Sequence, residues 1–168
     1  EWMEMGYFYY VDEPNNFGSD NFGTLTVAQS ADRLKRLFPD YRLVVPYYTN
    51  VRNSNGLDMT ETLANARVDL WCPVPSFWAP WDTTPNIKLD RQGVETYGTA
   101  EERFARYVEK GDELWWYVCI QPQYPYANLF ATYQGTMSRV LMWQQYKYNV
   151  KGLLYWSVNP WSYGAEWR

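Results

Sequence analysis

Strand-like and helix-like segments alternate along this chain, and the alternation restricts the folds that it can adopt. Short apolar runs are typical of buried strands, and the segments between them carry apolar residues at the spacing of amphipathic helices. Strands are predicted over residues 5–11, 43–47, 68–74, 114–120 and 153–158, and helices over 24–38, 60–66, 99–110 and 137–149. This order predicts an α/β protein with a parallel sheet and crossover helices.

Two architectures fit that order, a doubly wound open sheet and a segment of a (β/α)8 TIM barrel. The 168 residues are enough for one domain, whereas a complete barrel takes about 200 or more. Five strands would then form the later part of a barrel. Aromatic residues at the strand ends favour the barrel segment. The chain begins at Glu1 without an initiator methionine, so we expect residues 1–168 to be a piece of a longer protein.

Two adjacent carboxylates, Asp12 and Glu13, follow the first apolar run and precede Pro14. Proline has no N–H to donate and ends a strand ladder, so the acids are expected at the carboxyl end of a strand, where α/β proteins bind their ligands. Neighbouring strand residues point in opposite directions, and different surroundings can separate the pKa values of two carboxyl groups. The alternative is a solvated loop entry.

The composition leaves carboxylates as the main groups available for chemistry. The chain has no histidine, which excludes Ser-His-Asp and Cys-His catalysis and most zinc sites within it. It has no glycine-rich phosphate loop, and Cys72 and Cys119 lie in apolar runs typical of core residues. We therefore expect no cofactor and no metal. A net charge of −4 argues against a nucleic-acid partner, and no apolar run reaches the roughly 18 residues of a membrane span.

Aromatic residues make up 20% of the chain, including 10 Trp and 16 Tyr, and this content fits a sugar-binding protein. Aromatic faces stack on the C–H faces of sugar rings, although a tryptophan-rich core or a buried interface would give the same composition. Candidate substrate-binding residues lie at or near the predicted strand ends: Tyr10, Tyr47, Trp71, Gln121, Trp156, Asn159 and Trp161. Packing is the alternative role for each of them. Tyr10 is placed to hydrogen-bond Asp12.

A long segment, residues 73–98, follows the third predicted strand and carries Trp78 and Trp81. Ordered loops of this length are uncommon and often functional. The two tryptophans could cover an outer sugar or pack the loop against the protein.

No other predicted strand ends in a carboxylate, although ordinary retaining glycosidases need a second one about 5 Å from the acid. An adjacent Asp-Glu pair fits substrate-assisted hydrolysis, in which the acetamido oxygen of the substrate attacks the anomeric carbon. Glu13 would act as the acid and then as the base, and Asp12 would accept the acetamido N–H. A base outside the segment, or at Asp82 or Asp90, is the alternative.

Five blocks of sequence resemble glycoside hydrolase family 123 and occur in the order of that family: YFYYVDEP at 7–14, VDLWCP at 68–73, ELWWYVC at 113–119, RVLMW at 139–143 and GLLYWSVN at 152–159. The resemblance implies a (β/α)8 barrel and a substrate-assisted β-N-acetylgalactosaminidase. It places Asp12 and Glu13 in the stabiliser and acid roles after the fourth barrel strand. The chain would hold barrel strands 4 to 8, without the family's first three strands and its N-terminal β-sandwich.

The expected function is therefore an exo-acting glycosidase for a terminal N-acetylhexosamine of a glycan. Two alternatives remain, a non-catalytic carbohydrate-binding barrel and a glycosidase whose second carboxylate lies outside the segment. The isolated chain should be inactive and poorly folded, because a half-barrel without the N-terminal half of the same protein exposes two sheet edges. The sequence does not fix a compartment, and we favour a secreted or periplasmic location over a cytoplasmic one.

Overall fold

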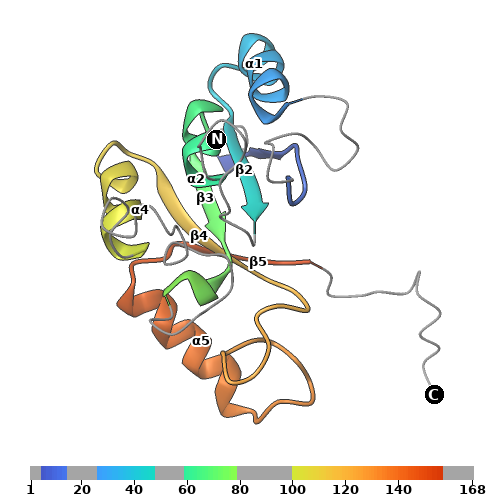
Figure 1. Cartoon of the computed structure of the whole chain (residues 1–168), viewed down its shortest axis with the longest axis vertical. Helices are drawn as coiled ribbons and strands as arrows, with labels where there is room; N and C mark the ends of the chain where they lie inside the picture. Colours follow the sequence, from blue (N-terminus) through green and yellow to red (C-terminus); the bar gives the residue numbers. More distant parts are fainter. Residues whose placement is uncertain (1–4, 15–25, 48–58, 79–99, 157–168) are drawn as a thin grey trace, which may run out of the picture.

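Five parallel strands form one sheet, and their order in the sheet is their order in the sequence (Figure 1). The computed structural model describes residues 5–14, 26–47, 59–78 and 100–156. The strands are β1 (Tyr7–Tyr9), β2 (Arg42–Tyr47), β3 (Leu70–Pro73), β4 (Glu113–Val118) and β5 (Gly152–Tyr155). Every neighbouring pair is parallel, which confirms the predicted α/β order.

The sheet curls into a half-barrel. β1 and β4 are three strand spacings apart in the sheet order, which in a flat sheet would separate them by about 14 Å. The rings of Tyr7 on β1 and Trp115 on β4 nevertheless lie 5.1 Å apart, edge to face. Arg42 on β2 likewise pairs with Glu113 on β4, across β3. The ring contact across three strand spacings indicates strong curvature, and it confirms the partial barrel.

The crossover segments contain the helices α1 (Val27–Leu37), α2 (Met59–Asn65), α4 (Ala100–Val108) and α5 (Thr136–Lys147), and the short 3-10 helix η2 (Pro75–Trp78). Figure 1 shows α4 and α5 on the same side of the sheet. No helix among the described residues is long and apolar enough to cross a bilayer.

Helix α1 begins two residues later than predicted. The cap is Thr26, whose hydroxyl accepts the N–H of Gln29 at 3.1 Å, while the Gln29 side chain accepts the N–H of Thr26 at 3.0 Å. This reciprocal capping box satisfies two backbone donors that the helix itself cannot. The buried face comprises Val27 and Ala31, whereas Leu37 in the last turn is 72% exposed.

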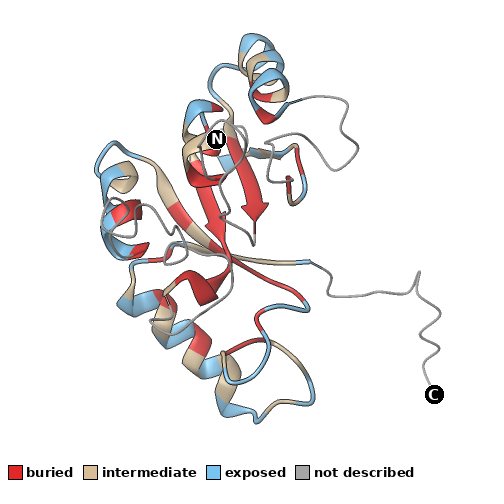
Figure 2. Ribbon diagram, viewed as in Figure 1, coloured by how far each residue is buried: buried red, intermediate tan, exposed pale blue. Residues whose placement is uncertain are grey.

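The core includes both faces of β2 and β3, and Figure 2 shows the buried residues gathered on the strands and on the helix faces turned toward them. Trp71 stacks on Tyr107 of α4 at 4.3 Å, and Trp116 of β4 contacts Tyr148, just after α5, at 6.0 Å. The tryptophan-rich composition is therefore used in part for packing.

Strand β1 is shorter and more open than predicted. The sequence predicts one buried strand over residues 5–11, but only Tyr7–Tyr9 pair with β2, and Tyr7 and Tyr9 are 42% and 45% exposed. The reason is that β1 is an end strand of the described sheet and the ring of Tyr7 faces its open concave side. An apolar run predicts a strand but does not reveal how many layers cover it.

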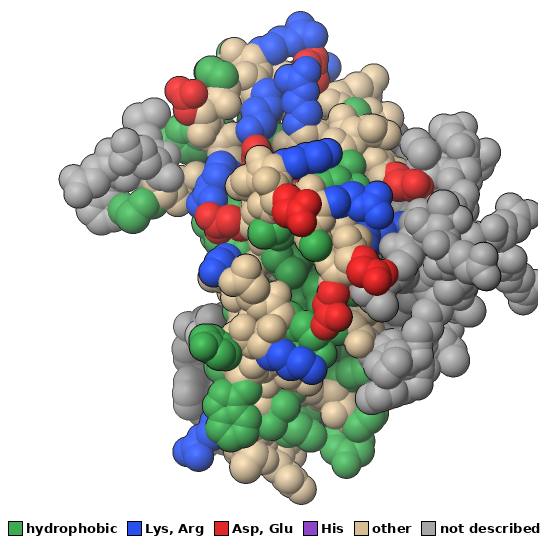
Figure 3. Space-filling model, turned by 90° about the vertical axis from the view of Figure 1, so that its left-hand side faces the viewer, with side chains coloured by type: hydrophobic (Ala, Val, Ile, Leu, Met, Phe, Trp, Pro, Cys, Tyr) green, Lys and Arg blue, Asp and Glu red, His purple; other side chains and the backbone are tan. Residues whose placement is uncertain are grey.

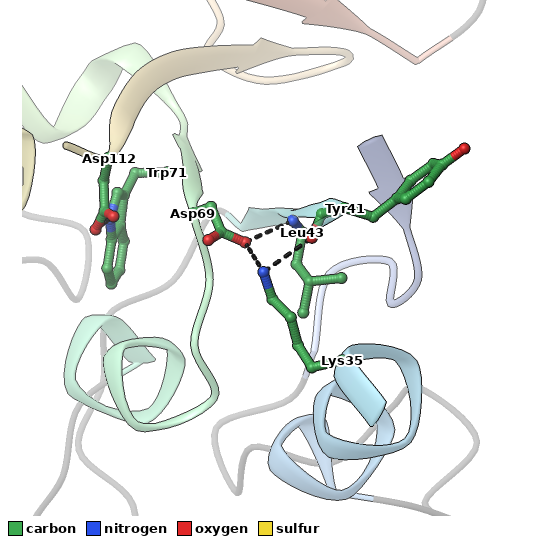
Figure 4. A network of polar contacts seen from close by, with 6 residues as sticks. All are labelled: Lys35, Tyr41, Leu43, Asp69, Trp71 and Asp112. Carbon is green, nitrogen blue, oxygen red and sulfur yellow. Dashed lines mark hydrogen bonds and ion pairs between the residues drawn. The ribbon is translucent and has the colours of Figure 1, made fainter. Parts of the chain in front are cut away.

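A polar network ties α1 to the amino ends of β2 and β3 (Figure 4). The ammonium of Lys35 donates to Asp69 Oδ2 and to the carbonyl of Tyr41, both at 2.8 Å, and the N–H of Leu43 donates to the same Asp69 oxygen at 2.8 Å. The amino ends of barrel strands generally carry stability rather than chemistry. This network therefore has a structural role.

The helix-covered side of the molecule carries mixed charges in its upper half and exposed hydrophobic side chains toward the bottom, where α5 lies (Figure 3). On α5, Met142, Trp143 and Tyr146 are 45%, 69% and 91% exposed.

Candidate active site

The acid pair lies in a bend that follows β1, beyond the carboxyl end of the strand. Val11 and Pro14 on either side are buried and anchor the bend. Glu13 has a φ of 42°, in the left-handed region that non-glycine residues rarely adopt. Such backbone strain persists only where the surrounding structure holds it, and it is concentrated at functional sites.

The two acids have different surroundings. Asp12 is exposed, and the hydroxyl of Tyr9 donates a hydrogen bond to its Oδ1. Glu13 is half-buried, and burial raises the pKa of its carboxyl, as does the nearby charge of Asp12. A hydrogen bond from the hydroxyl of Tyr117 acts in the opposite direction. On balance, the pKa of Glu13 lies above that of an ordinary glutamate.

Tyr117 reaches Glu13 from β4, on the far side of the curled sheet. Its side chain is only 5% exposed, and its hydroxyl contacts both the Glu13 carboxyl and the thiol of Cys119. Burial and these two neighbours raise the pKa of Tyr117, so its phenol remains neutral. Cys119 and Cys72 are buried free thiols, as predicted.

Neither of the two tyrosines next to the acids was predicted from the sequence to contact them. Tyr9 stands three residues before Asp12, and that spacing was a usable signal. Tyr10, two residues before Asp12, was expected to make this bond, but Tyr9 makes it instead. Tyr117 gave no comparable signal, because only the curvature of the sheet brings it to Glu13.

Three of the predicted substrate-binding residues lie in or against the core. Tyr47 is buried with its hydroxyl 3.2 Å from Thr60 Oγ1 of α2. Trp71 is buried on the helix side, where its Nε1 donates to Asp112 at 2.9 Å. Tyr10 packs against the core, and its buried hydroxyl has no partner among the described residues. None of the described contacts brings these three to the acid pair.

Two other predicted residues follow strands at the same edge of the sheet as the acids. Gln121 is exposed just beyond β4, and its backbone N–H points to Cys119 Sγ at 3.5 Å. Trp156 is 44% exposed directly after β5. Asn159 and Trp161 lie outside the described residues, as do Trp81, Asp82 and Asp90.

Trp78 packs rather than covering the acid pair. Its ring stacks on Phe104 of α4 at 5.4 Å and meets Trp116 edge to face at 5.3 Å. Of the two roles that the sequence left open for Trp78, the structure shows packing.

A comparison with protein families identifies the chain. The family model for the glycoside hydrolase 123 catalytic domain matches residues 79–165, a little over half of the sequence. The chain belongs to the glycoside hydrolase 123 family. A search of curated proteins finds no match.

Membership in family 123 makes a carbohydrate the substrate class and glycosidic hydrolysis the reaction class. The matched region contains α4, β4, α5 and β5, and therefore Tyr117 and Cys119. It does not reach Asp12 and Glu13.

A cavity of about 680 Å³ lies at the opposite end of this family 123 sheet, near the amino end of β3. Its lining includes Lys35 with its partner Asp69, and Arg67, Arg106 and Lys110 close to the ends of α2 and α4. Cations near helix C-termini offset the helix dipole, and Lys35 is already paired. Because the fold accounts for these charges, the candidate site stays at the acid pair. Within the described ranges, no group of Cys, Asp and Glu side chains could hold a metal ion.

Proposed function

We propose that Asp12 and Glu13 are the catalytic pair of a substrate-assisted, retaining glycosidase that removes terminal β-linked N-acetylgalactosamine or a close N-acetylhexosamine. The observation that carries the proposal is the contrast between the two adjacent acids. Asp12 is exposed and accepts a tyrosine hydroxyl, whereas burial raises the pKa of Glu13. A general acid needs to hold its proton near the working pH, and a charge stabiliser needs to remain ionised.

In the first step, the acetamido oxygen of the substrate attacks the anomeric carbon while Glu13 donates its proton to the departing glycosidic oxygen. The C–O bond to the leaving group breaks, and a cyclic oxazolinium-type intermediate forms. Asp12 accepts the acetamido N–H and stabilises the positive charge that develops on the ring.

In the second step, the ionised Glu13 takes a proton from water, and the resulting hydroxide attacks the anomeric carbon. The ring opens, the acetamido group is restored, and two inversions give retention of configuration. Glu13 regains the proton that it lost, so the acid is ready for another turnover.

The remaining parts of the barrel are expected from the same protein. We propose that residues 1–168 correspond to barrel strands 4 to 8, with the first three strands and a β-sandwich domain supplied by the preceding sequence. Two observations support this: Tyr7 and Tyr9 are open on the concave side, and β1 and β5 each pair with a single strand in the described sheet. The isolated piece should therefore lack activity.

The deciding experiment compares a chromogenic β-N-acetylgalactosaminide with the matching plain β-galactoside, using the full-length protein. Cleavage of the acetamido sugar alone, inhibited by a thiazoline mimic of the cyclic intermediate, is expected. Glu13→Gln should lower kcat/KM by about 100-fold or more, because it cannot donate the proton. Glu109→Gln, which alters an exposed carboxylate of the same type, is the matched control.

Cleavage of both sugars would contradict the substrate-assisted mechanism and indicate a second carboxylate elsewhere in the protein. Cleavage of neither sugar, together with binding of the acetamido sugar, would indicate a non-catalytic carbohydrate-binding barrel.

A further inference from the structure

Helix α5 presents two aromatic rings to solvent. Trp143 is 69% exposed and Tyr146 is 91% exposed. The two residues are three positions apart, which makes them neighbours on a helix surface. Figure 3 shows exposed hydrophobic side chains gathered at the end of the molecule where α5 lies. Exposed apolar side chains that cluster in this way mark a binding surface, whereas single ones need no explanation.

The direction of Trp143 shows that a complete barrel would leave it exposed. The buried residues of α5 are Leu141 and Gln145. Successive residues of an α-helix are turned by about 100°, so Trp143, midway between these two in the sequence, lies on the face opposite to them. Neighbouring helices of a barrel lie beside one another in an outer ring. They would therefore flank α5 without covering its outer face.

Two cations lie on the same outer face as Trp143. Arg139 and Lys147 are four residues before and after it, one helical turn away on either side, and α5 contains no Asp or Glu. Lys147 is in the last turn, where it offsets the helix dipole, and its ammonium lies 4.7 Å from the ring centre of Tyr148. Arg139 is near the amino end, where the dipole disfavours a cation, so helix stability does not account for it.

The chemistry of this face fits a carbohydrate chain that carries acidic groups. Aromatic rings stack on the C–H faces of sugars, and the indole N–H and phenol O–H can bond the hydroxyls at the ring edges. Arg139 and Lys147 would bind carboxylate or sulfate groups on the same chain. Residues 139–147 extend about 12 Å along the helix, which is enough for more than one sugar ring. Membership in a glycosidase family makes a glycan the macromolecule that this protein meets.

Two other occupants fit the face less well. A second copy bound through the same helix would place two faces of the same positive charge against each other, which is unfavourable. A helix that lies on a membrane needs a broad apolar face. In α5, the aliphatic residues Val140 and Leu141 pack against the core instead.

We propose that the outer face of α5, made of Arg139, Trp143, Tyr146 and Lys147, is an accessory binding surface for an acidic glycan chain. The surface lies on a helix outside the sheet, apart from the strand ends where the acid pair stands. It would hold a long glycan against the protein without contacting the bond that is cleaved. The inference rests on membership in a glycosidase family and does not depend on the proposed roles of the acid pair.

The test is isothermal titration calorimetry of the full-length protein with chondroitin sulfate, an acidic glycan, and with dextran, a neutral one. Chondroitin sulfate should bind more tightly than dextran, and Trp143→Ala and Tyr146→Ala should each weaken its binding by about tenfold. Arg139→Gln should weaken the binding of chondroitin sulfate and leave that of dextran unchanged. Leu37→Ala removes an exposed apolar side chain from α1 and is the matched control. All four variants should keep the parent's melting temperature, because the side chains are exposed.

Several results would overturn the proposal. They are no binding of chondroitin sulfate by the parent protein, unchanged binding by the two aromatic variants, and equal binding of both glycans. A dimer that Trp143→Ala dissociates would assign the face to a second copy. Pelleting with phosphatidylserine vesicles that Trp143→Ala abolishes would assign it to a membrane surface. Failure to cleave any chromogenic glycoside would reject the proposed function, but the calorimetry requires no turnover and would still decide the role of α5.

Discussion

The indole ring of Trp115 lies directly against Gly152 on the neighbouring strand. The two residues are paired in the register of β4 and β5, and a Cβ atom added to the glycine would lie 2.4 Å from a ring carbon of the tryptophan. Glycine at this position leaves room for the ring beside the β5 backbone. The ring in turn meets Tyr7, so the absence of one side chain on β5 supports the contact between β1 and β4.

Gly152→Ala should destabilise the protein by about 1–3 kcal/mol, because Trp115 must shift to admit the methyl group. Denaturant unfolding of the full-length protein measures the change. Gly135→Ala is the control, since nothing lies within 4 Å of a Cβ atom there and its backbone is already helical, with a φ of −60°. Equal stability losses in the two variants would show that the indole does not constrain Gly152.

Asp69→Ala should cost about 1–3 kcal/mol of unfolding free energy. The change leaves Lys35, whose side chain is 14% exposed, without its partner and removes the acceptor of the Leu43 N–H. Asp32→Ala breaks an exposed pair with Arg36 within α1 and should cost less than about 0.5 kcal/mol. A small effect at Asp69, measured by the same unfolding experiment, would show that the network does not stabilise the amino end of the sheet.

Glu13→Gln should raise stability at neutral pH and have little effect at acidic pH. The folded-state pKa of Glu13 lies above its ordinary value, so stability is full below the ordinary carboxyl pKa and is lost as pH rises through the folded pKa. Glutamine does not ionise and avoids this loss. The gain in unfolding free energy should be less than about 1 kcal/mol, because the group is half-exposed. Thermal melting at both pH values checks the prediction, and an equal gain at both would contradict it.

Trp71→Phe should lower stability without changing KM. The variant loses a partly buried hydrogen bond to Asp112 and part of the stacking on Tyr107. The Trp71 bond opposes the rise in the pKa of Asp112 that burial causes, so the loss in stability should be larger at neutral than at acidic pH. An increase in KM with unchanged stability would instead restore Trp71 as a substrate-binding residue.

The sequence predicted the order of the strands and helices because each depends on local periodicity. The four predicted helices and the last four strands occur within a few residues of their expected bounds. The predictions that failed concern features that depend on neighbouring residues or strands. The helix predicted over residues 24–38 begins later, because Thr26 and Gln29 form a capping box, and β1 is open where its apolar composition predicted burial.

The candidate site was harder to predict than the fold. The acid pair was visible because two carboxylates follow an apolar run, but the orientation of the aromatic residues was not. Tyr47 and Trp71 were expected near the substrate, yet their side chains pack against α2 and α4. An aromatic residue on a strand fits either face of a sheet, and only the register and curvature of the strands decide which face it takes.

The curvature of the sheet also determines when, during synthesis, Glu13 acquires its surroundings. Glu13 leaves the ribosome early, whereas Tyr117 follows only after β2, β3 and most of β4 have been made. Bringing the two together closes a long loop, which is an entropically costly step in folding. A nascent chain therefore contains both proposed catalytic acids before Glu13 has its final surroundings, and under the proposed function activity arrives with the docking of β4 rather than with the translation of the acid pair.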